Sequence, residues 1–158
     1  IKECDWSSDV CSSDLIKNLV GATLDHIGIA VADPDQAIRL YSNLGLVHST
    51  TEEITEQGVK AYIFPAGQTR IELLSPTRDD SPVAKFLSRK GQGLHHVAFL
   101  VEDINKALLT CIENNIKPLD SVPRIGAEGK LIAFLDPRTT GGVLIELTQS
   151  VKQESKDF

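Results

Sequence analysis

The sequence has 158 residues, of which 41% are hydrophobic and 24% are charged, and its formal net charge is −6. This length fits one domain, or two small modules that share a core, and the composition is ordinary for a globular protein. No apolar run approaches the roughly 20 residues that span a bilayer, and no Lys/Arg cluster suits a phosphate backbone. We therefore expect neither a membrane nor a nucleic-acid partner.

The chain begins with an unusual segment, residues 1–15, in which WSSDV is followed at once by CSSDL. It lacks the charged end and the apolar stretch of a signal peptide. We interpret it as a non-native or disordered extension. In the rest of the chain Cys111 is the only cysteine, which excludes an intrachain disulfide, and the net charge is −3. This composition favours the cytoplasm, or the mitochondrial matrix if a transit peptide is missing.

An internal repeat organises the remaining sequence. Leu24–Asp33 matches Leu94–Asp103 at an offset of 70, and Ile71–Leu73 matches Ile145–Leu147 at an offset of 74. Two echoes in the same order in both halves predict a tandem duplication. We expect a single domain over 22–150, made of two βαβββ modules and ended by a polar tail, 150–158. The ranges are about 22–76 for module one, 77–93 for the linker and 94–149 for module two.

In module one, a β-rich apolar strand is expected at Leu24–Val31. Asp33 has the position of a helix N-cap, Pro34 that of the first helical residue and Gly45 that of the stop. The strands that follow are predicted at about Leu46–Thr51, Val59–Phe64 and Thr69–Ser75.

The linker is expected to include a short helix around Pro82–Arg89. Module two then repeats the pattern, with a strand at Leu94–Val101, a helix capped by Asp103 and a stop at Asn114 and Asn115. Its later strands are predicted roughly at Lys117–Val122, Leu131–Asp136 and Val143–Thr148. The predicted fold is α+β, with strands of both modules forming one curved, partly open β-barrel-like sheet.

Four side chains occupy equivalent positions in the two modules. His26 and His96 lie in the first strands, and Glu72 and Glu146 in the last strands. A two-fold arrangement of the modules would bring them to one site on the concave face of the sheet. Two imidazoles and two carboxylates suit an octahedral divalent ion with two open positions. An isolated glutamate in such a strand more often points to solvent, but the paired histidines favour a metal site.

His95 adjoins His96 and has Asp25 as its counterpart in module one. Since neighbouring residues of a strand face opposite sides, we expect His95 to point away from the metal site and to serve in packing or hydrogen bonding.

The repeat and the four ligand positions resemble the vicinal oxygen chelate (glyoxalase/bleomycin-resistance) superfamily. Within it, the chain is similar to the methylmalonyl-CoA epimerase family over Leu24–Gln149. The stretches that carry this similarity are Leu24–Val31, Glu56–Val59, Ile71–Thr77, Pro82–Leu87, Gly93–Phe99, Pro123–Gly129 and Gly142–Thr148.

This resemblance implies an epimerase that interconverts (2R)- and (2S)-methylmalonyl-CoA by proton abstraction at carbon 2 through an enolate. It implies one divalent ion, with Co²⁺ preferred and Mn²⁺, Ni²⁺ or Mg²⁺ as alternatives, an acyl-CoA substrate and a homodimer. Epimerisation needs a base on one face of carbon 2 and a proton donor on the other.

Some members of that family carry a glutamate, proposed as one of the bases, at the position of Ala61. Its absence here leaves Glu146 as the first candidate base and Glu72 as the candidate for the opposite face. The glycine-rich stretch Arg124–Lys130 is either a flap whose Arg124 or Lys130 meets a carboxylate or a CoA phosphate, or a plain turn.

Three other functions stay open at this point. Glyoxalase I shares the metal site, and an extradiol dioxygenase uses two histidines and one glutamate, which would leave Glu72 unexplained. A non-catalytic ligand-binding member of the superfamily usually lacks part of the ligand set, so four intact ligands count against it.

Overall fold

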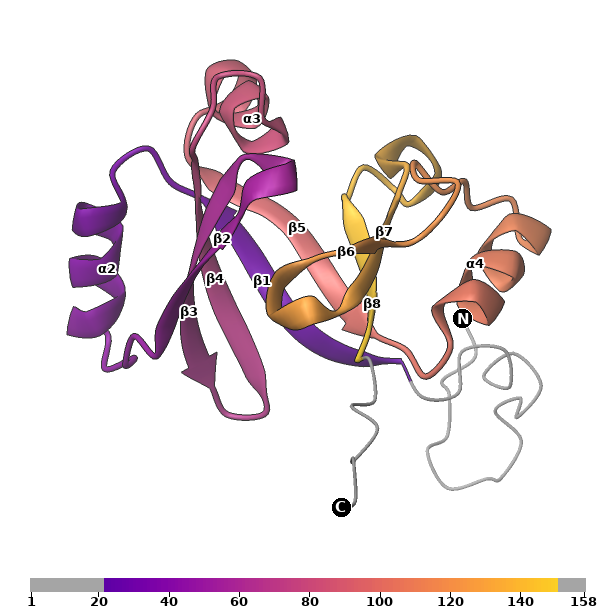
Figure 1. Cartoon of the computed structure of the whole chain (residues 1–158), viewed down its shortest axis with the longest axis horizontal. Coiled ribbons are helices and arrows are strands. Elements are labelled where there is room, and N and C mark those ends of the chain that lie inside the picture. Colours follow the sequence, from indigo (N-terminus) through magenta and orange to yellow (C-terminus); the bar gives the residue numbers. More distant parts are fainter. Residues whose placement is uncertain (1–21, 151–158) are drawn as a thin grey trace, which may run out of the picture.

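The structure, a computed structural model, describes residues 22–150. They form one eight-stranded mixed sheet with three α-helices (Figure 1). The strand order is β2-β3-β4-β1-β5-β8-β7-β6, so the second half of the sheet repeats the first in mirrored order. The predicted α+β fold of two βαβββ modules is confirmed. The extension predicted at 1–15 and most of the tail predicted at 150–158 lie outside the described residues.

Module one supplies four strands, one α-helix and a short 3-10 turn (η1). Its elements are β1 Thr23–Ala30, α2 Pro34–Asn43, β2 Thr50–Ile54, η1 Thr55–Gln57, β3 Val59–Ala66 and β4 Thr69–Pro76. The linker helix α3, Pro82–Lys90, follows as predicted.

Module two repeats this order with two 3-10 turns. Its elements are β5 Gly93–Leu100, α4 Ile104–Glu113, β6 Arg124–Ile125, η2 Ala127–Gly129, β7 Leu131–Leu135, η3 Pro137–Thr139 and β8 Ile145–Gln149. Strands β1 and β5 pair antiparallel at the centre of the sheet, and each pairs in parallel with the last strand of its own module. The two modules are therefore joined through a continuous backbone ladder.

The helices begin and end as their sequences predict. The Asp33 carboxylate accepts a hydrogen bond from the Gln36 backbone N–H, and Asp103 accepts one from Lys106 in the same way. Gly45 and Asn115 follow α2 and α4 with positive φ, the conformation that ends a helix. None of the helices within residues 22–150 is long and apolar enough to cross a membrane.

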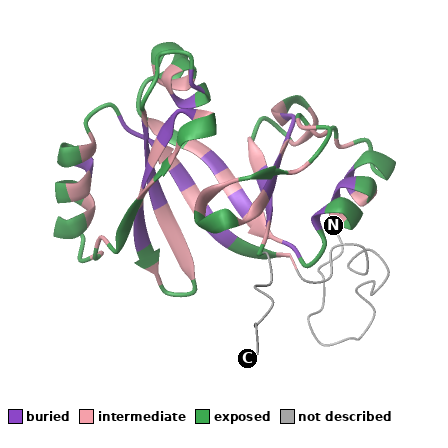
Figure 2. Cartoon of the chain, viewed as in Figure 1, coloured by how far each residue is buried: buried purple, intermediate pink, exposed green. Residues whose placement is uncertain are grey.

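The core lies mainly between the sheet and its helices, and Figure 2 colours buried residues along the strands and on one side of the helices. Under α4, Ile104 and Leu108 pack with Leu147 of β8. Under α2, Ala37 packs with Phe64 of β3 and Leu73 of β4. Strand alternation then turns the neighbours of Leu73 and Leu147 to the opposite face of the sheet. Two of those neighbours are Glu72 and Glu146.

The second strand of module one was predicted too early. Residues 46–48 follow α2 without joining the sheet, the Ser49 N–H donates to the Ile63 carbonyl of β3, and the strand itself is Thr50–Ile54. The Leu46 N–H donates to the Tyr41 carbonyl and completes the helix end, while Leu46 packs in the cluster under α2. The strand itself is polar, as is common at a sheet edge.

The strand predicted at Lys117–Val122 is also wrong. That stretch contributes only an isolated bridge between Pro118 and Leu135, and the edge strand β6 is Arg124–Ile125. Pro118 fits this bridge because the two flanking hydrogen bonds use the N–H groups of Leu119 and Asp136 and not its own. The pairing stops there, since the Phe134 N–H donates to the Asp120 side chain instead of a backbone carbonyl.

Candidate functional site

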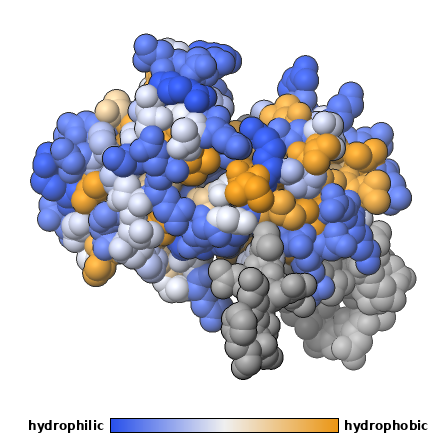
Figure 3. Space-filling view, viewed as in Figure 1, coloured by the Kyte–Doolittle hydropathy of each residue, from blue (hydrophilic) through white to orange (hydrophobic). Residues whose placement is uncertain are grey.

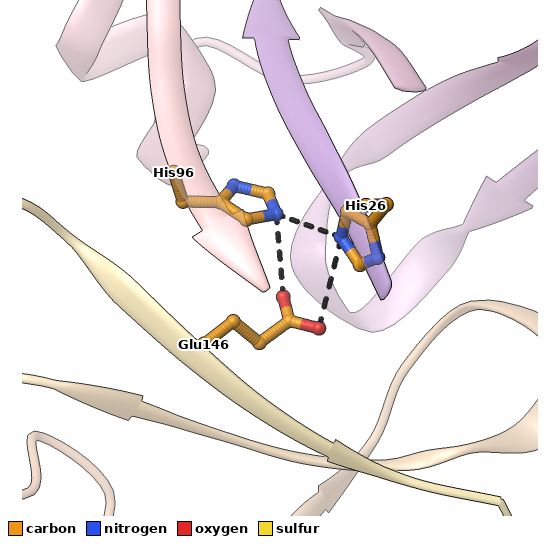
Figure 4. A group of neighbouring side chains, drawn as sticks. All are labelled: His26, His96 and Glu146. Atoms are coloured by element: carbon orange, nitrogen blue, oxygen red, sulfur yellow. Dashed lines mark hydrogen bonds and ion pairs between the residues drawn. The ribbon is translucent and has the colours of Figure 1, made fainter. Parts of the chain in front are cut away.

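Three of the four predicted ligands, His26, His96 and Glu146, converge at one point (Figure 4). Strand alternation places them on the face of the sheet opposite the clusters under α2 and α4. The Nε2 atoms of His26 and His96 lie 3.0 Å apart. Glu146 places Oε1 3.8 Å from Nε2 of His26 and Oε2 3.4 Å from Nε2 of His96. All three side chains are buried.

Strand register explains this convergence. In the β1–β5 ladder His26 pairs with Ala98, and His96 pairs with Gly28. In the β5–β8 ladder Ala98 also pairs with Glu146. Because directly paired residues lie on the same face of a sheet, the ladders bring β1, β5 and β8 side chains together although their sequence positions differ by up to 120.

The donor set fits a divalent cation. Adjacent ligands of an octahedral ion lie about 3 Å apart when each is about 2.1 Å from the ion, close to the separations of these three residues. Two facing imidazole nitrogens also need a shared proton or cation between them. The group therefore has the chemistry of a metal centre, with neutral nitrogen and carboxylate oxygen ligands.

Burial and charge set the protonation of the three groups. Burial raises the pKa of Glu146 to about 7, and the charge of Glu72 adds to the rise, although His26 opposes it. Burial lowers the pKa of His96 well below its ordinary value, and the neighbouring histidines act in the same direction. For His26, burial also disfavours the charged form, but the hydrogen bond to Asp25 and the charges of Glu72 and Glu146 outweigh it and raise the pKa.

The fourth predicted ligand, Glu72, is buried beside this group but meets it from another side. Its Oε1 lies 3.6 Å from Nδ1 of His26, whereas Glu146 lies near Nε2. Glu72 is therefore not part of the group in which the ligand atoms of His26, His96 and Glu146 lie close together. The two carboxylates thus approach His26 at its two different ring nitrogens.

Asp25 is a site residue that the sequence analysis missed as such. Its Oδ2 lies 2.8 Å from Nδ1 of His26, so the carboxylate accepts that N–H and leaves Nε2 to face His96. Arg70 donates to Asp25 at 2.7 Å and to Glu72 at 3.3 Å. Arg70 was predictable, because it lies two residues before Glu72 on the same face of its strand. Asp25 was not, because alternation places the residue before His26 on the opposite face, whereas the β1–β5 ladder has a register shift between Leu24 and His26.

Charged groups from the glycine-rich stretch complete this network. Lys130 Nζ lies 3.2 Å from Asp25 Oδ1 and 3.1 Å from Glu128 Oε2, and Glu128 also pairs with Arg70 at 3.3 Å. Burial raises the pKa of Asp25, but His26, Arg70 and Lys130 together lower it to about 2. The stretch therefore contacts module one through its own charges. Arg124, by contrast, pairs with Asp120.

His95 was expected on the other face, and this expectation is wrong. Its Nδ1 lies 2.9 Å from Nδ1 of His96, and its ring meets Phe86 of α3 edge-on at 4.9 Å. Both histidines line the same cavity. The register shift between Gly28 and Ile29 in the β1–β5 ladder marks an irregularity next to this position. Burial lowers the pKa of His95 to about 4, which keeps it neutral near pH 7.

A cavity of about 490 Å³ is lined by His26, His96 and Glu146 among other residues. Leu74 and Phe134 give it apolar walls, and Lys85, Arg89 and Lys90 line it from one side of α3. Figure 3 shows apolar side chains gathered over the β6 and β7 region, where Leu119, Val122 and Ile125 are exposed. The cavity therefore combines a buried group of candidate metal ligands, apolar walls and a basic border.

Ala61, where some members of the resembled family carry a glutamate, is fully buried in β3 between β2 and β4. It packs with Val59 and Leu74, both of which line the cavity. Its methyl group therefore lies in apolar surroundings and offers no proton acceptor.

A curved sheet of two βαβββ modules that brings histidines and glutamates together defines a class of metal-binding proteins. The chain belongs to the Glyoxalase/Bleomycin resistance protein/Dioxygenase superfamily, whose family model matches residues 25–134. Enzymes of this superfamily bind a divalent metal ion, in agreement with the donor group of His26, His96 and Glu146.

More specific similarities come from individual proteins. Over 127 residues the chain is 46% identical to the Bacillus subtilis protein YqjC, covering 80% of this chain and 91% of that protein. Over 129 residues it is 40% identical to human mitochondrial methylmalonyl-CoA epimerase, covering 80% of this chain and 73% of that protein. A variant of Streptomyces coelicolor methylmalonyl-CoA epimerase, solved with 2-nitronate-propionyl-CoA, has a TM-score of 0.76 at 35% identity, covering 82% of this chain and 97% of that structure.

Proposed function

We propose that this protein is a metal-dependent epimerase that interconverts (2R)- and (2S)-methylmalonyl-CoA by proton transfer at carbon 2. The observation that carries the proposal is the buried group of His26, His96 and Glu146 at the base of a cavity large enough for an acyl group. The similarity to methylmalonyl-CoA epimerases supports the choice of substrate.

In this proposal His26, Glu72, His96 and Glu146 hold one divalent ion, with Co²⁺ as the preferred ion and Mn²⁺, Ni²⁺ or Mg²⁺ as alternatives. Glu72 is the ligand that needs the largest adjustment, since it lies near Nδ1 rather than Nε2 of His26. When bound, the ion would neutralise charge that develops on the thioester oxygen as carbon 2 loses its proton.

The proton transfer itself belongs to the two glutamates. Glu146 takes the proton from carbon 2 of one epimer, and Glu72 returns a proton to the opposite face of the enolate. The reverse reaction exchanges the two roles. The contacts of the two carboxylates with different nitrogens of His26 support their placement on two sides.

The basic border of the cavity suits the phosphates of coenzyme A. Lys85, Arg89 and Lys90 form no ion pair with another described residue, so their charges are open to an anionic ligand. Lys130 and Arg124, the alternatives from the glycine-rich stretch, have carboxylate partners in the protein. A homodimer and a cytoplasmic or mitochondrial-matrix location stay predictions.

The test is isotope exchange. One epimer of methylmalonyl-CoA is incubated with the protein and Co²⁺ in deuterated water, and we expect racemisation together with deuterium uptake at carbon 2. Absence of exchange in protein with bound Co²⁺ would overturn the epimerase proposal. His26→Ala serves as the matched control and should lose both the bound ion and the exchange.

A further inference from the structure

Gly28 lies in the middle of β1, directly across the ladder from His96 of β5. A Cβ atom at this glycine would lie 2.3 Å from Cε1 of the His96 ring, 2.6 Å from Nδ1 and 2.8 Å from Nε2. Such separations are far below van der Waals contact. The imidazole of His96 therefore occupies the space that a side chain at Gly28 would need.

The backbone conformation does not require a glycine at position 28. Gly28 does not have a positive φ, so an alanine could adopt the same backbone conformation without strain. A glycine in a strand interior weakens the strand, and it often marks a close approach by another group. At Gly28 the approaching group is the His96 ring.

The His96 ring has little room to withdraw. Its Nδ1 lies 2.9 Å from Nδ1 of His95, and Phe134 meets it edge-on with ring centroids 5.5 Å apart. His26 meets it on another side, with ring centroids 5.1 Å apart. A methyl group on Gly28 would therefore displace the ring out of the position that Figure 4 shows, or push β1 and β5 apart.

The repeat offers an internal comparison. The counterpart of Gly28 in module two is Ala98, which pairs with His26 across the same ladder. Ala98 is fully buried and carries the methyl group that Gly28 lacks. The two modules therefore present their histidines differently, and only the His96 side needs a glycine.

We propose that Gly28 is a positioning residue, which sets the His96 ring so that its Nε2 meets Nε2 of His26 and the carboxylate of Glu146. The inference rests on the proposed role of His96 as a metal ligand. Gly28 itself touches neither substrate nor ion. Its contribution is the absence of a side chain, which lets the imidazole lie against the β1 backbone.

The first test measures Co²⁺ binding to the full chain by calorimetry. Gly28→Ala should weaken the affinity about 10- to 100-fold, the range that follows loss of support around a metal ligand. The matched control is Ala98→Gly, which changes the same methyl group at the equivalent position and should keep the affinity of the parent even if it lowers the melting temperature. Unchanged affinity in Gly28→Ala, or an equal loss in both variants, would overturn the proposal.

The second test separates the ring from the strand and works without metal. Melting temperatures are compared for the parent, Gly28→Ala, His96→Ala and the double variant. Gly28→Ala should lower the melting temperature, or prevent folding, only where His96 is present, because alanine at 96 leaves space for the methyl group. An equal decrease in both backgrounds contradicts the proposal. If the parent itself binds no Co²⁺, the proposed metal chemistry fails, while this cycle still decides what Gly28 contacts.

Discussion

His26 illustrates how much of the site depends on single contacts. One ring nitrogen faces Asp25 at 2.8 Å and Glu72 at 3.6 Å, and the other faces His96 at 3.0 Å and Glu146 at 3.8 Å. The ring is thus held by a carboxylate that orients it and lies between two carboxylates that are candidates for proton transfer. The roles of Glu72 and Glu146 can be separated by single substitutions.

Glu72→Gln tests the role of Glu72 as a proton carrier. The amide keeps an oxygen for the ion but cannot exchange a proton, so we expect Co²⁺ binding to persist while kcat falls about 10²- to 10⁴-fold. Activity is followed by deuterium uptake at carbon 2, and binding by calorimetry. Glu53→Gln on the exposed edge strand β2 is the control and should match the parent. Full activity in Glu72→Gln would remove Glu72 from catalysis.

The raised pKa of Glu146 predicts a pH-dependent metal affinity. Its value of about 7 lies above the ordinary 4.5, so the folded protein without metal holds this proton between those values while the unfolded chain releases it. The metal-free fold therefore loses stability from Glu146 as pH rises through this window, and binding an ion must expel the proton.

Co²⁺ affinity should fall about tenfold per pH unit below pH 7. His26, whose pKa is also raised, acts with the same sign. Equal affinity at pH 6 and pH 7.5 would contradict this prediction.

At the scale of elements, the parallel pairs β1–β4 and β5–β8 deliver the glutamates, and the β1–β5 ladder delivers the histidines. Helix α3, which belongs to neither repeat, closes one side of the cavity through Val83 and Phe86. Its exposed bases follow one another at helical spacing along that side. The linker between the repeats therefore contributes to the predicted ligand site and not only to connectivity.

Reversing charges on α3 tests this contribution. Lys85→Glu and Arg89→Glu should each raise the KM for methylmalonyl-CoA about two- to fivefold with kcat preserved, as expected for exposed charges worth about 0.5–1 kcal/mol. The effect should shrink at high ionic strength. Lys106→Glu on α4, away from the cavity, is the control and should keep the parental KM. A change of equal size in that control would show a general charge effect and not a local one.

In the whole molecule the two modules share one sheet, because β1 of module one pairs directly with β5 of module two. Their cores are nevertheless distinct, with one cluster under α4 and others under α2 and α3. Because the proposed metal ligands come from both modules, we expect the site to exist only when the central ladder is intact. Stability and metal binding are therefore expected to be properties of the assembled pair.

Ile104→Ala tests this coupling. Ile104 is fully buried under α4, and truncating it should lower the free energy of unfolding by about 2–4 kcal/mol through lost burial and a residual cavity. Urea unfolding followed by far-UV circular dichroism should still show one transition, because β1 and β5 unfold together. Leu109→Ala, on the exposed side of the same helix, should change stability by less than about 0.5 kcal/mol. Two separate transitions in Ile104→Ala would contradict a shared cooperative unit.

The repeat made both the fold and the four ligand candidates predictable, since the same residue types recur in the same order at offsets of 70 and 74. Helix ends were predictable too, because Asp33, Asp103 and Gly45 act through local geometry. The errors arose where local pattern competes with tertiary pairing. Leu46 is used to end α2, and after the bridge at Pro118 the Asp120 side chain takes the Phe134 N–H that a continuing strand would need.

The repeat was enough to single out four candidate site residues, because an imidazole or a carboxylate in a buried strand needs a partner and the repeat supplies four such side chains. How those four differ follows from the folded structure. Strand register brings His26, His96 and Glu146 to one point and places Glu72 at the other side of the His26 ring. The same register sets His96 against Gly28 and His26 against Ala98. Register and ring orientation depend on contacts between strands far apart in the chain, which no local pattern encodes.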